Sequence, residues 1–194
     1  MFRYSRIRRD SYSKRVNNEA EAFTAGLSES SEMVSRKDEN EAILSPAVLQ
    51  LLQQEAQAAG VFESVSVEDD RLNCKASESA EDAWYRVETD QGRIYVSLVM
   101  KDRWLSESIE AELMHTGDSI EELLDEELED AGYEGSPLPV EHFRSEDMYF
   151  TFRSPVPVES AADEKVLAEK LKKCLLAYEA TFRELGDMQP AKEL

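Results

Sequence analysis

Two apolar stretches joined by a short polar turn constrain the fold of this chain more than any other feature. WYRVE at 84–88 and RIYVSLVM at 93–100 flank the turn TDQG at 89–92. In the second stretch every second residue from Ile94 to Met100 is large and apolar, which places these side chains on one face of a strand. A polar turn that ends in glycine between two such stretches is typical of a β-hairpin. The chain therefore contains an antiparallel sheet.

Shorter stretches of the same period surround this hairpin. Val65 and Val67 alternate with polar residues, as do the apolar residues of 72–76, and the aspartate pair at 69–70 supplies a turn between them. The stretch DMYFTFRSPV at 147–156 alternates in the same way. We predict an antiparallel sheet of about five to six strands. The segment YEGSPLPVEHF, which precedes the last of them, has two prolines and is interpreted as a connection.

Three other segments have helical periodicity. Ser45 and Pro46 are typical of the start of a helix, apolar residues follow at helical spacing, and Gly60 is placed to end the run. Ser119 and Glu122 form a capping box that opens an acidic middle helix. A long last helix has an apolar stripe that indicates either packing on the sheet or a dimer seam: Leu167, Leu171, Leu175, Tyr178, Phe182 and Leu185.

These elements predict an α+β fold in which an antiparallel sheet is flanked by an N-terminal helix, an acidic middle helix and a long C-terminal helix. We assign the single α+β domain to residues 44–186 and a flexible tail to 187–194. Residues 1–43 are basic and then polar, with few large apolar side chains, which favours a disordered arm. Its first part, 1–20, is typical either of a targeting segment or of a disordered basic tail.

The formal net charge of −20 at pH 7 is unevenly distributed. Residues 1–18 carry six basic groups against one acidic group, and the remaining residues carry 16 basic and 41 acidic groups. An acidic body repels phosphates and anionic membranes, so we expect neither nucleic-acid contact by the folded body nor membrane binding. A protein partner with a basic or extended segment is favoured instead. Two cysteines without a disulfide or zinc pattern favour the cytoplasm.

The most acidic stretch holds eleven carboxylates between residues 106 and 131, without one Lys or Arg. In its second half the acids occupy the sides of the middle helix that its leucines leave free. We interpret them as a solvated surface that binds a basic partner through Glu121, Glu122, Asp125, Glu126 and Glu129. In the first half, Ile109, Ala111 and Leu113 alternate with polar or flexible residues. We prefer a strand over a helix for 108–115, although its residue types are mostly helix formers.

A divalent-metal-dependent enzyme is the alternative, with ligands from the 107–118 cluster: Glu110, Glu112, His115 and Asp118. Glu112 and His115 form one E-x-x-H, half of the pattern found in carboxylate-bridged di-iron bundles. In a strand these two side chains point to opposite faces, so the alternative requires a helical 108–115. His142 is interpreted as a surface or structural histidine. Without a nucleophile elbow, a phosphate loop or a complete metal motif, we predict no catalytic residues and no cofactor.

An apolar helix, a run of strands that includes RIYVSLVM, an acidic helix, the strand DMYFTFRSPV and a last helix succeed one another between residues 44 and 185. This order, with the size and acidity, resembles the type III secretion chaperone-like fold, including its YbjN group. The resemblance implies a small, acidic, often dimeric module that binds polypeptides, and it assigns no individual residues. We therefore expect a non-enzymatic, chaperone-like or regulatory protein-binding module, and the resemblance implies that it can form a homodimer.

Overall fold

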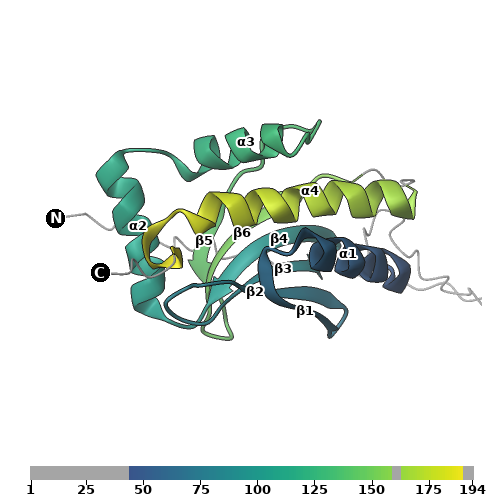
Figure 1. The fold of residues 1–194 in the computed structure, drawn as a ribbon, viewed down its shortest axis with the longest axis horizontal. Helices are drawn as coiled ribbons and strands as arrows, with labels where there is room; N and C mark the ends of the chain where they lie inside the picture. The colour runs from purple at the N-terminus through teal and green to yellow at the C-terminus, as the bar shows by residue number, and fades with distance from the viewer. Residues whose placement is uncertain (1–43, 159–162, 190–194) are drawn as a thin grey trace, which may run out of the picture. The chain divides into compact units, whose positions relative to one another are not determined.

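Six antiparallel strands form the centre of the structure (Figure 1). The computed structural model describes residues 44–158 and 163–189. The strands lie in the order β1-β2-β3-β4-β6-β5, and each pairs antiparallel with its neighbours. Their bounds are Phe62–Glu68 for β1, Arg71–Ala76 for β2, Ala83–Asp90 for β3, Arg93–Met100 for β4, Glu141–Arg144 for β5 and Phe150–Val156 for β6. The predicted antiparallel sheet is confirmed.

Helices flank this sheet, so the α+β class predicted from the sequence is confirmed as well. α1 (Pro46–Ala59) and α4 (Glu164–Arg183) pack against each other, and both contact the sheet. α3 (Ile120–Asp130) packs on α4 and, in Figure 1, lies on the side of α4 away from the sheet. α2 (Arg103–Thr116) follows β4 and packs beside a short 3-10 helix, η1 (Gly186–Met188).

The hydrophobic core lies between the sheet and the pair α1 and α4. Alternate strand residues such as Leu72, Val87 and Leu98 point into it and are fully buried. The whole predicted stripe, from Leu167 to Leu185, is buried in this core, which supports packing within the chain over a dimer seam. Cys74 and Cys174 are unpaired and buried in the same core, and burial raises the pKa of each thiol to about 12. Both cysteines therefore act as small core residues.

Two of the predicted helices, α1 and α3, are capped at the expected residues. The Ser45 hydroxyl accepts a hydrogen bond from Val48 N at 3.2 Å, and Gly60 ends α1 with a φ of 68°. The Ser119 hydroxyl accepts from Glu122 N at 3.2 Å and starts α3. These bonds satisfy backbone groups that have no partner inside the helix, which is why short polar residues mark helix ends so clearly in a sequence.

The segment 108–115 is helical, so the preferred strand is wrong. It belongs to α2, where the Asp102 carboxylate accepts a 2.8 Å hydrogen bond from the backbone N–H three residues later and Gly117 ends the helix with a φ of 81°. The alternating residues do not share one environment, because Ile109 is fully buried whereas Ala111 is exposed. Helix-forming residue types and two caps therefore outweigh a short period-two pattern.

Strand β5 lies in the segment that the sequence indicated to be a connection, so this part of the prediction is also wrong. It has only four residues, pairs with β6 alone and forms one edge of the sheet. Its only large apolar residue is Phe143, so no alternation of apolar and polar residues marks it. Pro137 and Pro139 just before it added to the signal for a loop.

The expected domain end at residue 186 falls inside η1. Met188, only 1% exposed, packs into the hydrophobic core, so ordered structure continues beyond that position. The arm assigned to residues 1–43 and the end of the assigned tail, 190–194, lie outside the described residues. In the part of the chain that the structure describes, no helix combines the length and the apolar character needed to cross a membrane.

Candidate functional site

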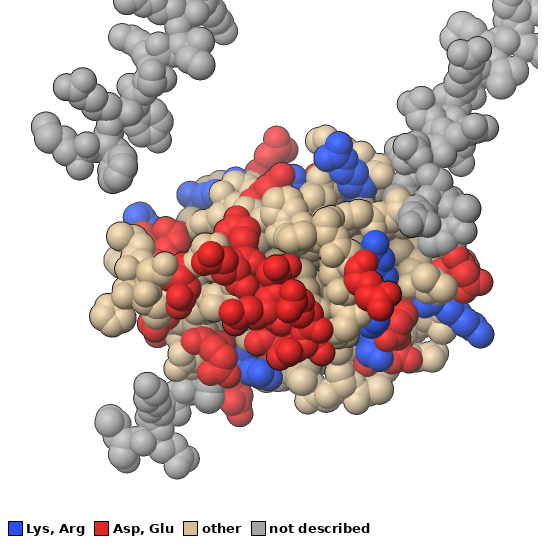
Figure 2. Space-filling view, turned by 90° about the horizontal axis from the view of Figure 1, so that it is seen from above, with Lys and Arg blue, Asp and Glu red and all other residues tan. Residues whose placement is uncertain are grey.

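The five predicted partner-binding carboxylates lie together on the outward side of α3. Leu124 and Leu128, each 1% exposed, orient the helix by packing into the core. Positions three and four apart are neighbours on a helix, so the five carboxylates share the side of α3 that its apolar residues leave free. We call them the acidic face: Glu121, Glu122, Asp125, Glu126 and Glu129. Figure 2 shows a continuous patch of acidic side chains over this helix.

The acidic face is not neutralised by the described part of the chain. None of its carboxylates lies within 4.0 Å of a Lys, Arg or His nitrogen of residues 44–158 and 163–189. Lys173 of α4 lies near the end of α3 but donates a 2.8 Å hydrogen bond to the Gly132 carbonyl. Like charges at neighbouring helix positions repel each other. A cationic ligand would relieve that repulsion.

The structure does not gather the four residues of the metal alternative. Glu110, Glu112 and His115 lie on α2, and Asp118 follows its C-terminal Gly117. The helix places Glu112 and His115 on one face but turns Glu110 to another. Among the described residues, no three or more His, Cys, Asp or Glu side chains come close enough together to hold a metal ion. Because 108–115 is helical, Glu112 and His115 of the E-x-x-H lie on one face, as a shared metal ion would require. The described residues bring no third ligand to this pair.

A serine, a histidine and a glutamate form a cluster that sequence reasoning missed. Ser106 Oγ lies 3.3 Å from His142 Nε2, and His142 Nδ1 lies 3.7 Å from Glu110 Oε1. The imidazole also stacks on the Phe152 ring, with centroids 3.9 Å apart and planes 6° from parallel. Burial lowers the pKa of His142, and the nearby Glu110 carboxylate opposes this effect. The imidazole is therefore mainly neutral at neutral pH.

This cluster has the residue types of a hydrolytic triad but not an accessible nucleophile. Ser106 is only 1% exposed, because it lies on the inner side of α2 against β5. An acyl substrate must reach the serine oxygen and a pair of oxyanion donors at the same time. We therefore assign Ser106 and His142 a structural role, in which they join α2 to the edge strand. The chain separates them by 36 residues, and the unpredicted β5 hid their proximity.

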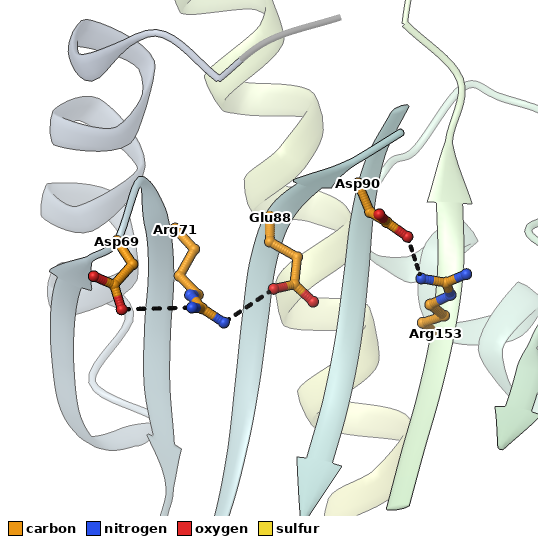
Figure 3. A network of polar contacts seen from close by, with 5 residues as sticks. All are labelled: Asp69, Arg71, Glu88, Asp90 and Arg153. Atoms are coloured by element: carbon orange, nitrogen blue, oxygen red, sulfur yellow. Dashed lines mark hydrogen bonds and ion pairs between the residues drawn. The ribbon is translucent and has the colours of Figure 1, made fainter. Parts of the chain in front are cut away.

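Ion pairs connect neighbouring strands at one end of the sheet (Figure 3). Arg71 lies between Asp69 and Glu88, with nitrogen–oxygen distances of 3.5 Å to each. These residues line a hollow of about 590 Å³ at the start of α1. We assign no ligand to the hollow, because Arg71 already bridges two of its carboxylates, which is typical of structural ion-pair networks.

A second arginine shields the face of the sheet that points away from the core. Arg153 pairs with Asp90 and Glu141 at 2.9 Å each, and the Asp90 contact is visible in Figure 3. Its guanidinium carbon lies 4.2 Å from the centre of the Tyr95 ring and 4.8 Å from that of Phe143. Tyr95 is consequently only 6% exposed. Ion pairs and cation–π contacts thus cover aromatic surface that no helix of the described residues covers.

Comparison with protein-family models, with curated proteins and with solved structures yields no match for this chain.

Proposed function

We propose that this chain is a non-enzymatic, chaperone-like or regulatory protein-binding module whose acidic face holds a basic or extended segment of a partner protein. The observation that carries the proposal is the stripe of five outward carboxylates without an ion pair from the described residues. Such a surface attracts cations over several ångströms and increases the rate of encounter with a basic segment. The edge strands β1 and β5 offer further backbone hydrogen bonds to an extended segment.

The resemblance to type III secretion chaperone-like proteins, a cytoplasmic setting and a homodimeric state belong to the same proposal. Two buried cysteines without a disulfide support a reducing compartment. Because the apolar stripe of α4 is buried within one chain, a homodimer would use another surface. No observation on the described residues favours the metal-dependent enzyme over this binding role.

A basic probe peptide of alternating Lys and Ser residues, labelled with a fluorophore, tests the acidic face. We expect saturable binding by fluorescence anisotropy at about 20 mM salt and its loss at about 300 mM, because salt screens exposed charges. Neutralising the face should weaken binding about tenfold, since exposed charge contacts contribute up to about 1 kcal/mol each and are only partly additive. That variant carries E121Q, E122Q, D125N, E126Q and E129Q.

A matched variant removes the same number of charges from exposed positions outside α3 that make no ion pair with a described residue. It carries E68Q, E78Q, E81Q, E146Q and D147N. We expect this control to retain most of the affinity, because attraction to a local cluster depends on distance as well as on net charge. Equal losses in the two variants, or no binding at low salt, would refute the acidic face as the partner site.

A further inference from the structure

A second surface, at one end of the sheet, combines aromatic and cationic side chains. Trp84 on β3 and Tyr149 before β6 meet edge-on, with ring centroids 6.4 Å apart. Trp104, 73% exposed, lies in the first turn of α2, and Met148, 55% exposed, adjoins Tyr149. We call this surface the aromatic end: Trp84, Arg86, Lys101, Trp104, Met148 and Tyr149. It contains both tryptophans of the chain.

Two cations of the aromatic end share one ring. The guanidinium carbon of Arg86 lies 5.0 Å from the centre of the Tyr149 ring, and the Lys101 ammonium lies 5.3 Å from it. Neither cation forms an ion pair with a carboxylate of the described residues. The chain has 42 acidic residues against 22 basic ones, so two neighbouring cations without a carboxylate partner run against its composition.

Two buried polar atoms at this surface have no hydrogen-bond partner among the described residues, and one of them belongs to the Arg86 guanidinium. Arg86 Nε and Ser97 Oγ are both enclosed and have no hydrogen-bond partner in the described residues. Arg86 and Ser97 are cross-strand neighbours on β3 and β4, so their side chains share one face of the sheet. Trp84, two residues before Arg86, lies on that same face. Buried polar groups are almost always hydrogen-bonded in folded proteins, so the Arg86 guanidinium keeps hydrogen-bonding capacity that the described residues do not use.

The chemistry of this surface specifies its ligand. Carboxylate oxygens suit an unpaired guanidinium and ammonium, and Trp, Tyr, Met and Arg are the residue types enriched at protein interfaces. Nucleic acid and a second copy of this chain would each bring many negative charges to an acidic body. We infer that the aromatic end binds a partner polypeptide segment with one carboxylate beside an apolar side chain. This role is independent of the acidic face, because it uses other residues and a ligand of opposite charge.

Intrinsic tryptophan fluorescence can test this inference, because both tryptophans lie at the aromatic end. The probe is a short peptide, acetylated at its N-terminus and amidated at its C-terminus, in which a single Glu adjoins Phe and Leu and all other residues are Ser or Gly. We expect a saturable change in emission on the intact chain and about tenfold weaker binding for Arg86→Gln and for Lys101→Gln, the usual effect of losing one charge-assisted contact. Lys165→Gln, an exposed change on α4, should bind like the unaltered chain.

Several results would overturn the inference. One is the absence of any emission change up to millimolar peptide, and another is equal affinity in Arg86→Gln, Lys101→Gln and the control. A response to a single-stranded oligonucleotide but not to the peptide would assign the surface to nucleic acid. Emission that changes with protein concentration alone, together with dimers in sedimentation velocity, would assign it to a second copy. Lys101 is exposed, so its variant remains informative even if Arg86→Gln unfolds.

Discussion

Glu179 shows how one enclosed charge affects the stability of this chain. Glu179 is only 6% exposed. Its carboxylate accepts a 3.3 Å hydrogen bond from Arg183, whose side chain is 47% exposed. Burial raises the pKa of this carboxyl above its usual value, Arg183 opposes the shift, and Glu127 and Glu184 add to it. The folded chain therefore holds this proton to a higher pH than the unfolded chain does.

The expected consequence is a loss of stability as pH rises from about 4.5 through the folded-state pKa of Glu179, because the unfolded carboxyl releases its proton first. Glu179→Gln removes this penalty and should stabilise the chain by about 1 kcal/mol at pH 7, the usual size of a single-residue effect. The gain should shrink toward pH 4. Urea unfolding at both pH values measures it. Two results would contradict this account. One is a variant that is less stable than the unaltered chain at pH 7, and the other is an equal change in the free energy of unfolding at both pH values.

At the scale of elements, the Asp102 cap contributes to the stability of α2 alongside its packing. Three of its residues are buried, namely Leu105, Ser106 and Ile109.

We expect Asp102→Ala to lower the free energy of unfolding by about 1 kcal/mol, because the carboxylate accepts a hydrogen bond from a backbone N–H of the first turn that has no partner inside the helix. Asp118→Ala, just beyond the helix, is the matched control and should change stability by less than about 0.5 kcal/mol. Chemical denaturation with a circular dichroism readout measures both. Equal stabilities of the two variants would argue against the cap.

Local signals explain which elements the sequence could predict. The hairpin of β3 and β4 and the capped helices α1 and α3 are encoded by short-range periodicity, turn residues and N-caps. α2 was misassigned because three alternating residues imitate a strand, whereas the decisive Asp102 cap lies six residues before the segment. β5 has no periodic signal, because it exists through its pairing with β6 alone. Such long-range pairing cannot be read from one stretch of sequence.

At the scale of the whole molecule, the two surfaces differ in how far the sequence predicts them. The acidic face follows from one helix, because the positions of Leu124 and Leu128 decide which carboxylates point outward. The aromatic end joins β3, the end of β4, the start of α2 and the turn before β6. Its residues come together only once the register between β4 and β6 is fixed. Composition indicates the overall charge but not a cationic site within an acidic body.

The net charge of −20 sets the response of the whole fold to salt. Screening weakens both the ion pairs between strands and the repulsion among unpaired carboxylates, so the larger effect decides the sign. Exposed ion pairs contribute at most about 1 kcal/mol each, and most pairs here are partly exposed.

Repulsion should therefore dominate, and the melting temperature should rise by roughly 2–5 °C between about 20 mM and about 200 mM NaCl, equivalent to about 1 kcal/mol for a domain of this size. The variant with a neutralised acidic face should show a smaller rise, because part of the repulsion is already gone. Differential scanning calorimetry measures both. A melting temperature that falls with salt would show that the ion pairs of Arg71, Lys75 and Arg153 stabilise the fold more than the unpaired carboxylates destabilise it.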